Sequence, residues 1–130
     1  MKIDPALKYT ANDEWVRVEG QIATVGITDY AQEQLSDIVF VEITAAVGQA
    51  LAKGAAFATI ESVKAAAEAY MPAGGTITAV NEDLPAAPER INADAYGEAW
   101  MIRFEIGDPA ELSGLMNAAA YEKRCEERSH

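Results

Sequence analysis

The chain is poor in the residue types on which many enzymes and secreted proteins depend. It has one cysteine, Cys125, and one histidine, His130, which is the last residue. A single cysteine excludes an internal disulfide and fits a reducing compartment. The sequence also lacks a P-loop, a dinucleotide-binding glycine motif, HExxH and a nucleophile elbow. A small hydrolytic enzyme needs a nucleophile paired with a base, so the sequence disfavours an enzyme of this kind. No metal site is expected either.

Positive charge is scarce as well. The chain has 10 Lys and Arg residues against 21 Asp and Glu, which gives a net charge of -11. Phosphate binding requires clustered cations, so nucleic acid is not an expected partner. An acidic surface instead favours partners that present basic docking faces.

Long apolar runs are absent. No segment approaches the ~20 apolar residues of a membrane-spanning helix. The first residues, MKIDPALKYT, lack the apolar core of a signal peptide. The sequence therefore predicts no membrane association and a cytoplasmic location, or the mitochondrial matrix if the chain is a mature eukaryotic form.

What the chain does contain predicts one β-rich domain spanning residues 1–130. Its 130 residues are 50% hydrophobic, which suits a single core. Short alternating or β-branched runs, separated by glycine and proline, are typical of strands. These runs are 15–19, 21–27, 37–43, 57–62, 68–71, 76–80 and 100–105. We therefore expect a β sandwich or barrel.

Helices are expected at two places on this β framework. Thr28 or Asp29 predicts the cap of a short helix after the first hairpin. Asp108, with proline next and Glu111 as a second capping residue, predicts the start of a C-terminal helical segment that runs to about Arg128. That segment is expected to break near residues 114–117, and residues 82–97 are expected to be irregular.

One lysine stands out within this pattern. Lys64 lies in ESVKAAA, between two strand-like runs, which predicts that it occupies a hairpin tip. An ordinary solvated turn lysine is the simplest interpretation, because most lysines are exposed. The three alanines that follow favour a functional role for this lysine, since they remove bulk from around the amine and leave room for another protein's active site.

The surroundings of Lys64 resemble the swinging-arm domains that carry lipoyl or biotinyl groups. Gly48, the ESVKA segment and Gly75 carry that resemblance. Biotinyl domains usually flank the lysine with methionines, whereas Val63 and Ala65 stand here, which favours the lipoyl branch. Over nearly the whole chain the sequence resembles the H protein of the glycine cleavage system, through GITDYAQ and ESVKA together with the segments around residues 9, 14–20, 92, 96–100 and 121.

The resemblance implies a fold and a role. The fold would be a lipoyl-domain-like β sandwich (barrel-sandwich hybrid), with a short helix after the first hairpin and C-terminal helices. The role would be that of a monomeric carrier, not an enzyme, with lipoate attached covalently to Lys64. The implied partners are a pyridoxal-phosphate glycine decarboxylase, a tetrahydrofolate-dependent aminomethyltransferase, dihydrolipoamide dehydrogenase, and a lipoate ligase or a lipoyl or octanoyl transferase.

The resemblance also implies a resting cleft for the arm. It lies near Glu14, with Asn12 and Glu68 as neighbours, where a carboxylate could pair with the amine of the loaded arm. Taken alone, Glu14 would be interpreted as a solvated edge residue. The family usually has histidine before the Glu-Trp pair, whereas Asp13 stands here, so the details of this cleft differ.

Two further functions share this scaffold. A lipoyl domain of a 2-oxo-acid dehydrogenase would lack the N-terminal WVRVEG hairpin and the terminal helices. A lipoate-relay protein, which hands its lipoyl group to other proteins, is hardly distinguishable from the glycine cleavage carrier by sequence.

Overall fold

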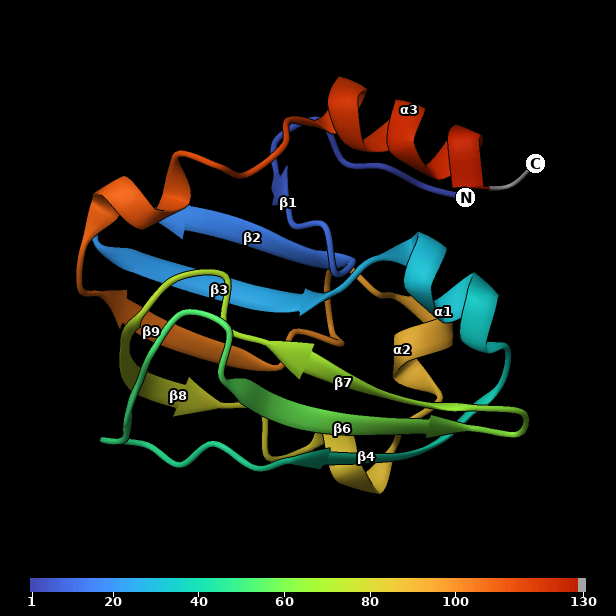
Figure 1. Ribbon diagram of the computed structural model, residues 1–130. Helices are drawn as coiled ribbons and strands as arrows, with labels where there is room; N and C mark the ends of the chain where they lie inside the picture. Colours follow the sequence, from blue (N-terminus) through green and yellow to red (C-terminus); the bar gives the residue numbers. More distant parts are fainter. Residues whose placement is uncertain (129–130) are drawn as a thin grey trace.

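The computed structural model describes residues 1–128 and contains two β-sheets packed face to face (Figure 1). Within these residues the larger sheet has six strands in the order β1-β2-β3-β9-β8-β5. Their bounds are β1 Lys8–Tyr9, β2 Glu14–Glu19, β3 Ile22–Ile27, β9 Ile102–Ile106, β8 Gly75–Val80 and β5 Ala50–Leu51. Ser129 and His130 lie outside the described residues.

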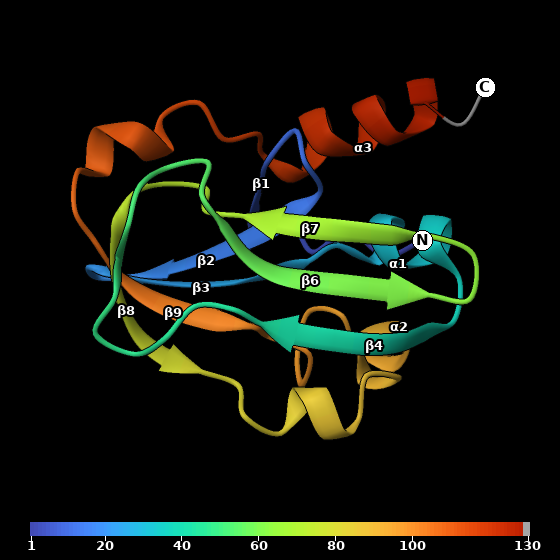
Figure 2. The ribbon, with the colours of Figure 1, turned by 60° about the horizontal axis from the view of Figure 1, so that its bottom comes forward.

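The smaller sheet carries the segment that the sequence singled out. In the described chain it has three strands in the order β4-β6-β7, with β4 Ile38–Ile43, β6 Ala56–Ser62 and β7 Ala66–Tyr70. Figure 2 shows this sheet in front of the larger one, with the β6–β7 hairpin extending to one end of the molecule. The turn of this hairpin is therefore reached from the solvent on several sides.

Helical elements flank the sheets. They are α1 Asp29–Leu35, η1 Leu84–Ala86, α2 Arg90–Ala93, η2 Pro109–Leu112 and α3 Ala118–Arg128. Thr28 caps α1, because its side-chain oxygen accepts a hydrogen bond from the Ala31 N–H at 3.1 Å. No helix in residues 1–128 is long and apolar enough to cross a bilayer.

Two apolar clusters hold the layers together. The main core fills the space between the sheets and includes Val16, Val41, Phe57 and Phe104. The second cluster lies under α3, where Tyr9 stacks on Tyr121 with ring centroids 4.5 Å apart. Its other buried members are Leu7, Trp15, Tyr30 and Cys125. The last helix is thus part of the fold rather than an appendage.

All seven expected strands are present in the described residues, and the sandwich is the expected fold class, but four details differ. β1 and β5 are two-residue strands that have no sequence signal. Residues 82–97, expected to be irregular, contain η1 and α2. β2 does not alternate between buried and exposed residues. Glu14, Trp15 and Val16 are all buried, because Val16 packs into the main core while Trp15 packs into the cluster under α3, and Val18 and Glu19 are both exposed.

The fourth difference concerns Glu111, which was expected to help cap the C-terminal helix. Asp108 caps η2 by accepting from the Ala110 N–H at 3.0 Å. The carboxylate of Glu111 points elsewhere and accepts from the Gly74 N–H at 2.8 Å. Glu111 therefore joins η2 to the loop before β8. The expected break in the helical segment is present between η2 and α3.

Candidate functional site

Lys64 lies at the tip of the β6–β7 hairpin, in a turn whose central residues are Val63 and Lys64. The Ser62 N–H donates to the Ala65 carbonyl at 2.8 Å and closes the turn. The Ser62 hydroxyl oxygen accepts from the N–H groups of Lys64, at 3.2 Å, and Ala65, at 3.0 Å. A serine hydroxyl of this kind replaces the backbone acceptor that a turn normally uses. The turn therefore holds its shape without glycine, asparagine or proline.

The surroundings of Lys64 leave its amine accessible. Lys64, Ala65 and Ala66 are exposed, and Glu61 opposite Ala66 is also exposed. The Val63 N–H donates to the Asp37 carbonyl at 3.1 Å, which anchors the turn to the residue before β4. The lysine thus projects from a fixed base into open space.

Glu14 begins β2 and is buried, with 1% of its surface exposed. One carboxylate oxygen accepts from the Thr10 hydroxyl at 2.6 Å, and the other accepts from the Tyr70 N–H at 3.2 Å. Burial raises the pKa of Glu14 to about 7, while these two hydrogen bonds partly offset the rise and the nearby charge of Asp13 adds to it. Glu14 is therefore not a solvated edge residue.

The three residues expected around the arm lie on two pockets that share Asn12. Glu14 and Asn12 line a pocket of about 170 Å³ together with Lys53 and Met71. Asn12 and Glu68 line another of about 190 Å³, between α1 and the β6–β7 hairpin. Glu14 lines the first of these two pockets and Glu68 lines the second. The second pocket is lined by residues of β6 and β7, the strands that lead to the Lys64 turn, whereas the first lies beyond the other end of β7, at Met71 and Pro72.

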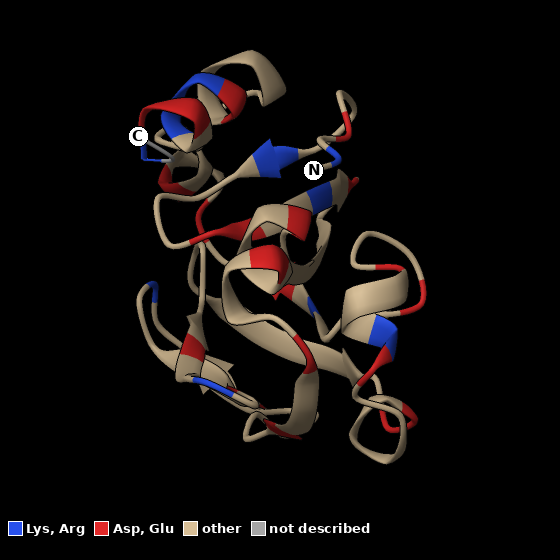
Figure 3. Ribbon diagram, turned by 90° about the vertical axis from the view of Figure 1, so that its right-hand side faces the viewer, with Lys and Arg blue, Asp and Glu red and all other residues tan. Residues whose placement is uncertain are grey.

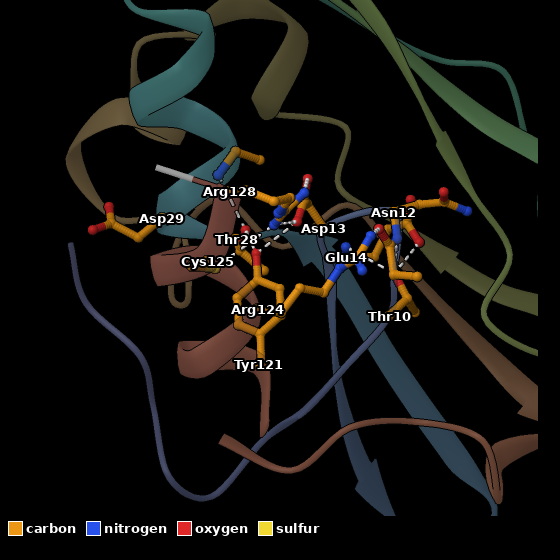
Figure 4. Close-up of polar contacts among 12 residues, drawn as sticks. Thr10, Asn12, Asp13, Glu14, Thr28, Asp29, Tyr121, Arg124, Cys125 and Arg128 are labelled. Carbon is orange, nitrogen blue, oxygen red and sulfur yellow. Dashed lines mark hydrogen bonds and ion pairs between the residues drawn. The ribbon is translucent and has the colours of Figure 1, made fainter. Parts of the chain in front are cut away.

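The turn that carries these residues is held by the last helix (Figure 4). Asp13 has φ of 68°, in the left-handed region that few side chains adopt. Its carboxylate accepts from the Tyr121 hydroxyl at 2.9 Å, and the oxygen of that hydroxyl lies 2.7 Å from the Thr28 hydroxyl oxygen. Arg124 donates to the Ala11 carbonyl at 3.2 Å. Sequence patterns gave no sign of these contacts, because the residues are about a hundred positions apart.

Asn92, one of the residues that carried the resemblance, has a structural position. Its amide donates to Gln32 Oε1 at 2.8 Å and to the Ser36 carbonyl at 2.9 Å, and its carbonyl oxygen accepts from the Ile38 N–H at 2.9 Å. These bonds fix the segment that connects α1 to β4. Asn92 therefore supports the hairpin end of the molecule without lying on either pocket.

Cys125 and three residues of the segments that carried the resemblance have structural roles. Cys125 is buried, and its sulfur lies 3.7 Å from an Arg128 nitrogen. The Trp15 indole donates to the Ala95 carbonyl at 2.8 Å. A side chain at Gly26 would approach the Trp15 ring to within 2.8 Å, so glycine is required there. Trp100 is half-buried, beneath the guanidinium of Arg103. His130 lies outside the described residues.

Acidic side chains surround the hairpin end. Figure 3 faces this end, and Asp and Glu segments are spread across it. The exposed acidic residues next to the turn and along β4 are Asp37, Glu42, Glu61 and Glu68. A lysine on an exposed, narrow hairpin of a β sandwich, within an acidic surface, is the arrangement expected in the class of carrier proteins that hold a group on a swinging arm.

Comparisons with known proteins identify the family within this class. The chain matches the family model "Glycine cleavage H-protein" over residues 7–128. It is 52% identical over 115 residues to the glycine cleavage system H protein of Beijerinckia indica subsp. indica, an alignment that covers 88% of this chain and 92% of that protein. It is 51% identical over 127 residues to the corresponding Clostridium botulinum (strain Kyoto / Type A2) protein, covering 98% and 96% of the two chains.

A solved structure is similar across almost the whole molecule. The crystal structure of a glycine cleavage system H protein from Mycobacterium marinum matches with a TM-score of 0.81 and 30% identity, over 94% of this chain and 98% of that chain. The chain belongs to the glycine cleavage H-protein family. This confirms the resemblance and the expected fold class, and it favours this family over the lipoyl domain of a 2-oxo-acid dehydrogenase.

Proposed function

We propose that this chain is the carrier protein of a glycine cleavage system and bears a lipoyl group on Lys64. Family membership supports the role, and the position of Lys64 supports the site. The single observation that carries the assignment is an exposed lysine at the end of a hairpin whose neighbours Ala65 and Ala66 are small and exposed.

The residues of the hairpin fit covalent attachment. The unprotonated Lys64 amine would attack the carbonyl carbon of an activated acyl donor, an acyl adenylate or thioester. An amide bond would form, the donor's leaving group would depart with its electron pair, and the amine would lose a proton. When bound, a lipoyl group supplies a disulfide that takes up an aminomethyl group and an electron pair. The hairpin supplies reach: a flexible tether raises the effective concentration of the attached group at each enzyme that it visits.

The cleft residues have a proposed role in protecting the loaded arm. A loaded arm ends in an amine, which is cationic at neutral pH. Glu14 offers a buried carboxylate whose oxygens are already oriented by Thr10 and by the Tyr70 backbone. Pairing would favour the ionised form of Glu14. Asn12, shared by both pockets, and Glu68 would line the path between the turn and Glu14.

The proposed function requires other proteins to perform the chemistry. The carrier would receive its aminomethyl group from a pyridoxal-phosphate glycine decarboxylase and deliver it to a tetrahydrofolate-dependent aminomethyltransferase. Dihydrolipoamide dehydrogenase would reoxidise the dithiol. A lipoate ligase, or a lipoyl or octanoyl transferase, would attach the group, and the chain would act as a monomer without catalytic activity of its own. The compared relatives are bacterial, which favours the cytoplasm as the place of action.

Mass spectrometry of protein from its native host tests the proposal. The intact mass should exceed the sequence mass by one lipoyl amide, and peptide mapping should place it on Lys64. Lys64→Arg keeps the charge but cannot form the amide, so glycine cleavage should be lost while the unfolding transition is unchanged. Lys123→Arg, at an exposed lysine of α3 that lines neither pocket, is the matched control and should be modified normally. Modification elsewhere, or full activity of Lys64→Arg, would contradict the proposal.

A further inference from the structure

Two successive side chains of β4 face the solvent. Val39 and Phe40 are 56% and 43% exposed, whereas Ile38 and Val41 on either side are buried. A regular strand would alternate, with every second side chain turned inward. Phe40 is a large aromatic residue on a strand next to the core, so its exposure needs a specific cause.

The cause is a β-bulge. In the pairing of β4 with β6, Ile38 lies opposite Ser62 and Phe40 lies opposite Glu61, so Val39 is an extra residue without a partner position. A bulge of this type sets two residues of one strand against one of the other and re-aims the side chains. The inward positions of Ile38 and Val41 are kept, and both intervening side chains turn outward.

The exposed pair lies beside the Lys64 turn. Val63, the other central residue of that turn, is 67% exposed, and its N–H donates to the Asp37 carbonyl just before β4. β4 is an end strand of its sheet. Val39, Phe40 and Val63 therefore form an apolar patch, which we call the β4 patch, at the hairpin end of the molecule.

The β4 patch continues into a groove. Phe40 lines an open groove of about 360 Å³, and Val80 and Pro85 also line it. Glu42 and Glu82 also line it, and both are exposed. Asp37 and Glu61 lie at the other end of the patch. An apolar centre with a charged rim is the usual anatomy of a protein interface.

The charge of the rim selects the occupant. A second copy of this chain would bring another net charge of -11 and another acidic rim against the first, and the repulsion would oppose pairing. A partner with an apolar contact surface edged by Lys and Arg would satisfy both the centre and the rim.

The reach of Lys64 selects among such partners. Enzymes that act on the far end of a long arm do not need to contact the hairpin closely. The enzyme that modifies the bare lysine must bring its active site to an amine that is separated from the backbone only by the lysine side chain. The surface of that enzyme must therefore lie against the turn and β4. We propose that the β4 patch is the docking surface for the enzyme that attaches the lipoyl group. This inference rests on the proposed function of Lys64.

Matched substitutions test it, because the chain offers apolar residues of equal exposure elsewhere. Val18 is 43% exposed, as Phe40 is, and Val47 is 65% exposed, close to Val63. The unmodified chain would be incubated with a lipoate ligase, lipoate and ATP, and the rate of mass gain followed at low and saturating carrier concentration. Phe40→Ser and Val63→Ser should each lower kcat/KM by about tenfold, equivalent to about 1.4 kcal/mol. Val18→Ser and Val47→Ser should change it less than about twofold, well below that tenfold step.

Unfolding and sedimentation measurements complete the test. Unfolding transitions that match the unaltered chain, together with the loss in kcat/KM, would support docking. Equal modification rates for all four variants would overturn it, and so would a dimer of the chain that Phe40→Ser dissociates. Failure of the unaltered chain to be modified on Lys64 would instead remove the proposed function and this inference together, so the two failures are distinguishable.

Discussion

Arg128 and Asp13 form a two-point ion pair that joins the end of α3 to the turn before β2. Arg128 Nη2 lies 2.6 Å from Asp13 Oδ1, and Nη1 lies 3.1 Å from Oδ2. The guanidinium also lies over the Tyr30 ring of α1, 4.4 Å from its centroid. Paired donors of this kind fix geometry as well as adding energy. The carboxylate that stands where the family usually has histidine is thus the anchor of the last helix.

Removing this anchor should lower stability. In Arg128→Gln the free energy of unfolding should fall by about 1–2 kcal/mol, because hydrogen bonds between charged groups are lost. The partial exposure of both side chains limits the contribution of these bonds to stability. Urea unfolding measures the difference. Arg90→Gln is the control: Arg90 lies 3.9 Å from Glu98 in a more exposed pair, and its loss should cost less than about 0.5 kcal/mol. Equal effects of the two substitutions would contradict the anchoring role.

The stability of the protein should depend on the ionisation of Glu14. Burial raises its pKa from 4.5 to about 7. Below pH 4.5 the carboxyl is protonated in both the folded and the unfolded chain. Above that, the unfolded chain loses the proton first, so this group lowers stability progressively as pH rises to about 7. The loss is at most about 3.5 kcal/mol, because the shift from 4.5 to about 7 is worth about 1.4 kcal/mol for each pKa unit.

Glu14→Gln isolates that contribution, because the amide does not titrate. Its carbonyl oxygen can keep one of the two present hydrogen bonds, from the Thr10 hydroxyl or from the Tyr70 N–H. The cost of losing the other bond does not vary with the ionisation of a side chain at position 14, so the change of the difference with pH is the quantity to measure. The variant should gain stability relative to the unaltered chain between pH 4.5 and 7, measured by urea unfolding across that range. A constant difference between the two proteins across the range would show that Glu14 keeps an ordinary pKa.

The lifetime of the loaded carrier should depend on the same carboxylate. If Glu14 pairs with the terminal amine of the arm, Glu14→Gln should release ammonia and formaldehyde from the loaded carrier about tenfold faster, which corresponds to about 1.4 kcal/mol of lost interaction. Lipoyl attachment should be unaffected. Glu19→Gln, an exposed carboxylate at the other end of β2, is the control. An unchanged release rate in Glu14→Gln would leave Glu14 with a structural role only.

The acidic surface should act on encounter rates. Raising salt shortens the Debye length from ~30 Å at 0.01 M to ~8 Å at physiological ionic strength. The association rate of the lipoylated carrier with the glycine decarboxylase should fall over this range, while the dissociation rate changes little. Glu61→Gln, beside the turn, should weaken the salt dependence more than Glu122→Gln on α3. A salt-independent association rate would restrict the acidic surface to a role in solubility.

Local sequence signals were sufficient for most of the sandwich. Alternation predicted the longer strands, a polar cap predicted α1, and the position of ESVKAAA between two strands predicted the exposed tip. These features depend on neighbours in the chain, which is why a sequence reveals them.

The remaining features depend on contacts between distant segments. Glu14 is buried, with its carboxylate held by the Thr10 hydroxyl and by the Tyr70 N–H at the end of β7, which is 56 positions away in the sequence. The Asp13 anchor requires Arg128, and Glu111 turns to Gly74 instead of its own helix end. The bulge at Val39 is hidden because IVFVEI looks like an ordinary buried strand.

The bulge in β4 has a consequence for how insertions and deletions act in this strand. With Val39 omitted, Ile38, Val41 and Ile43 would still turn inward and Phe40 would still turn outward, in a regular ladder against β6. Omitting any inward residue would instead reverse the facing of every residue that follows. The packing of the core therefore does not require Val39. The extra residue changes only which side chains β4 presents to the solvent.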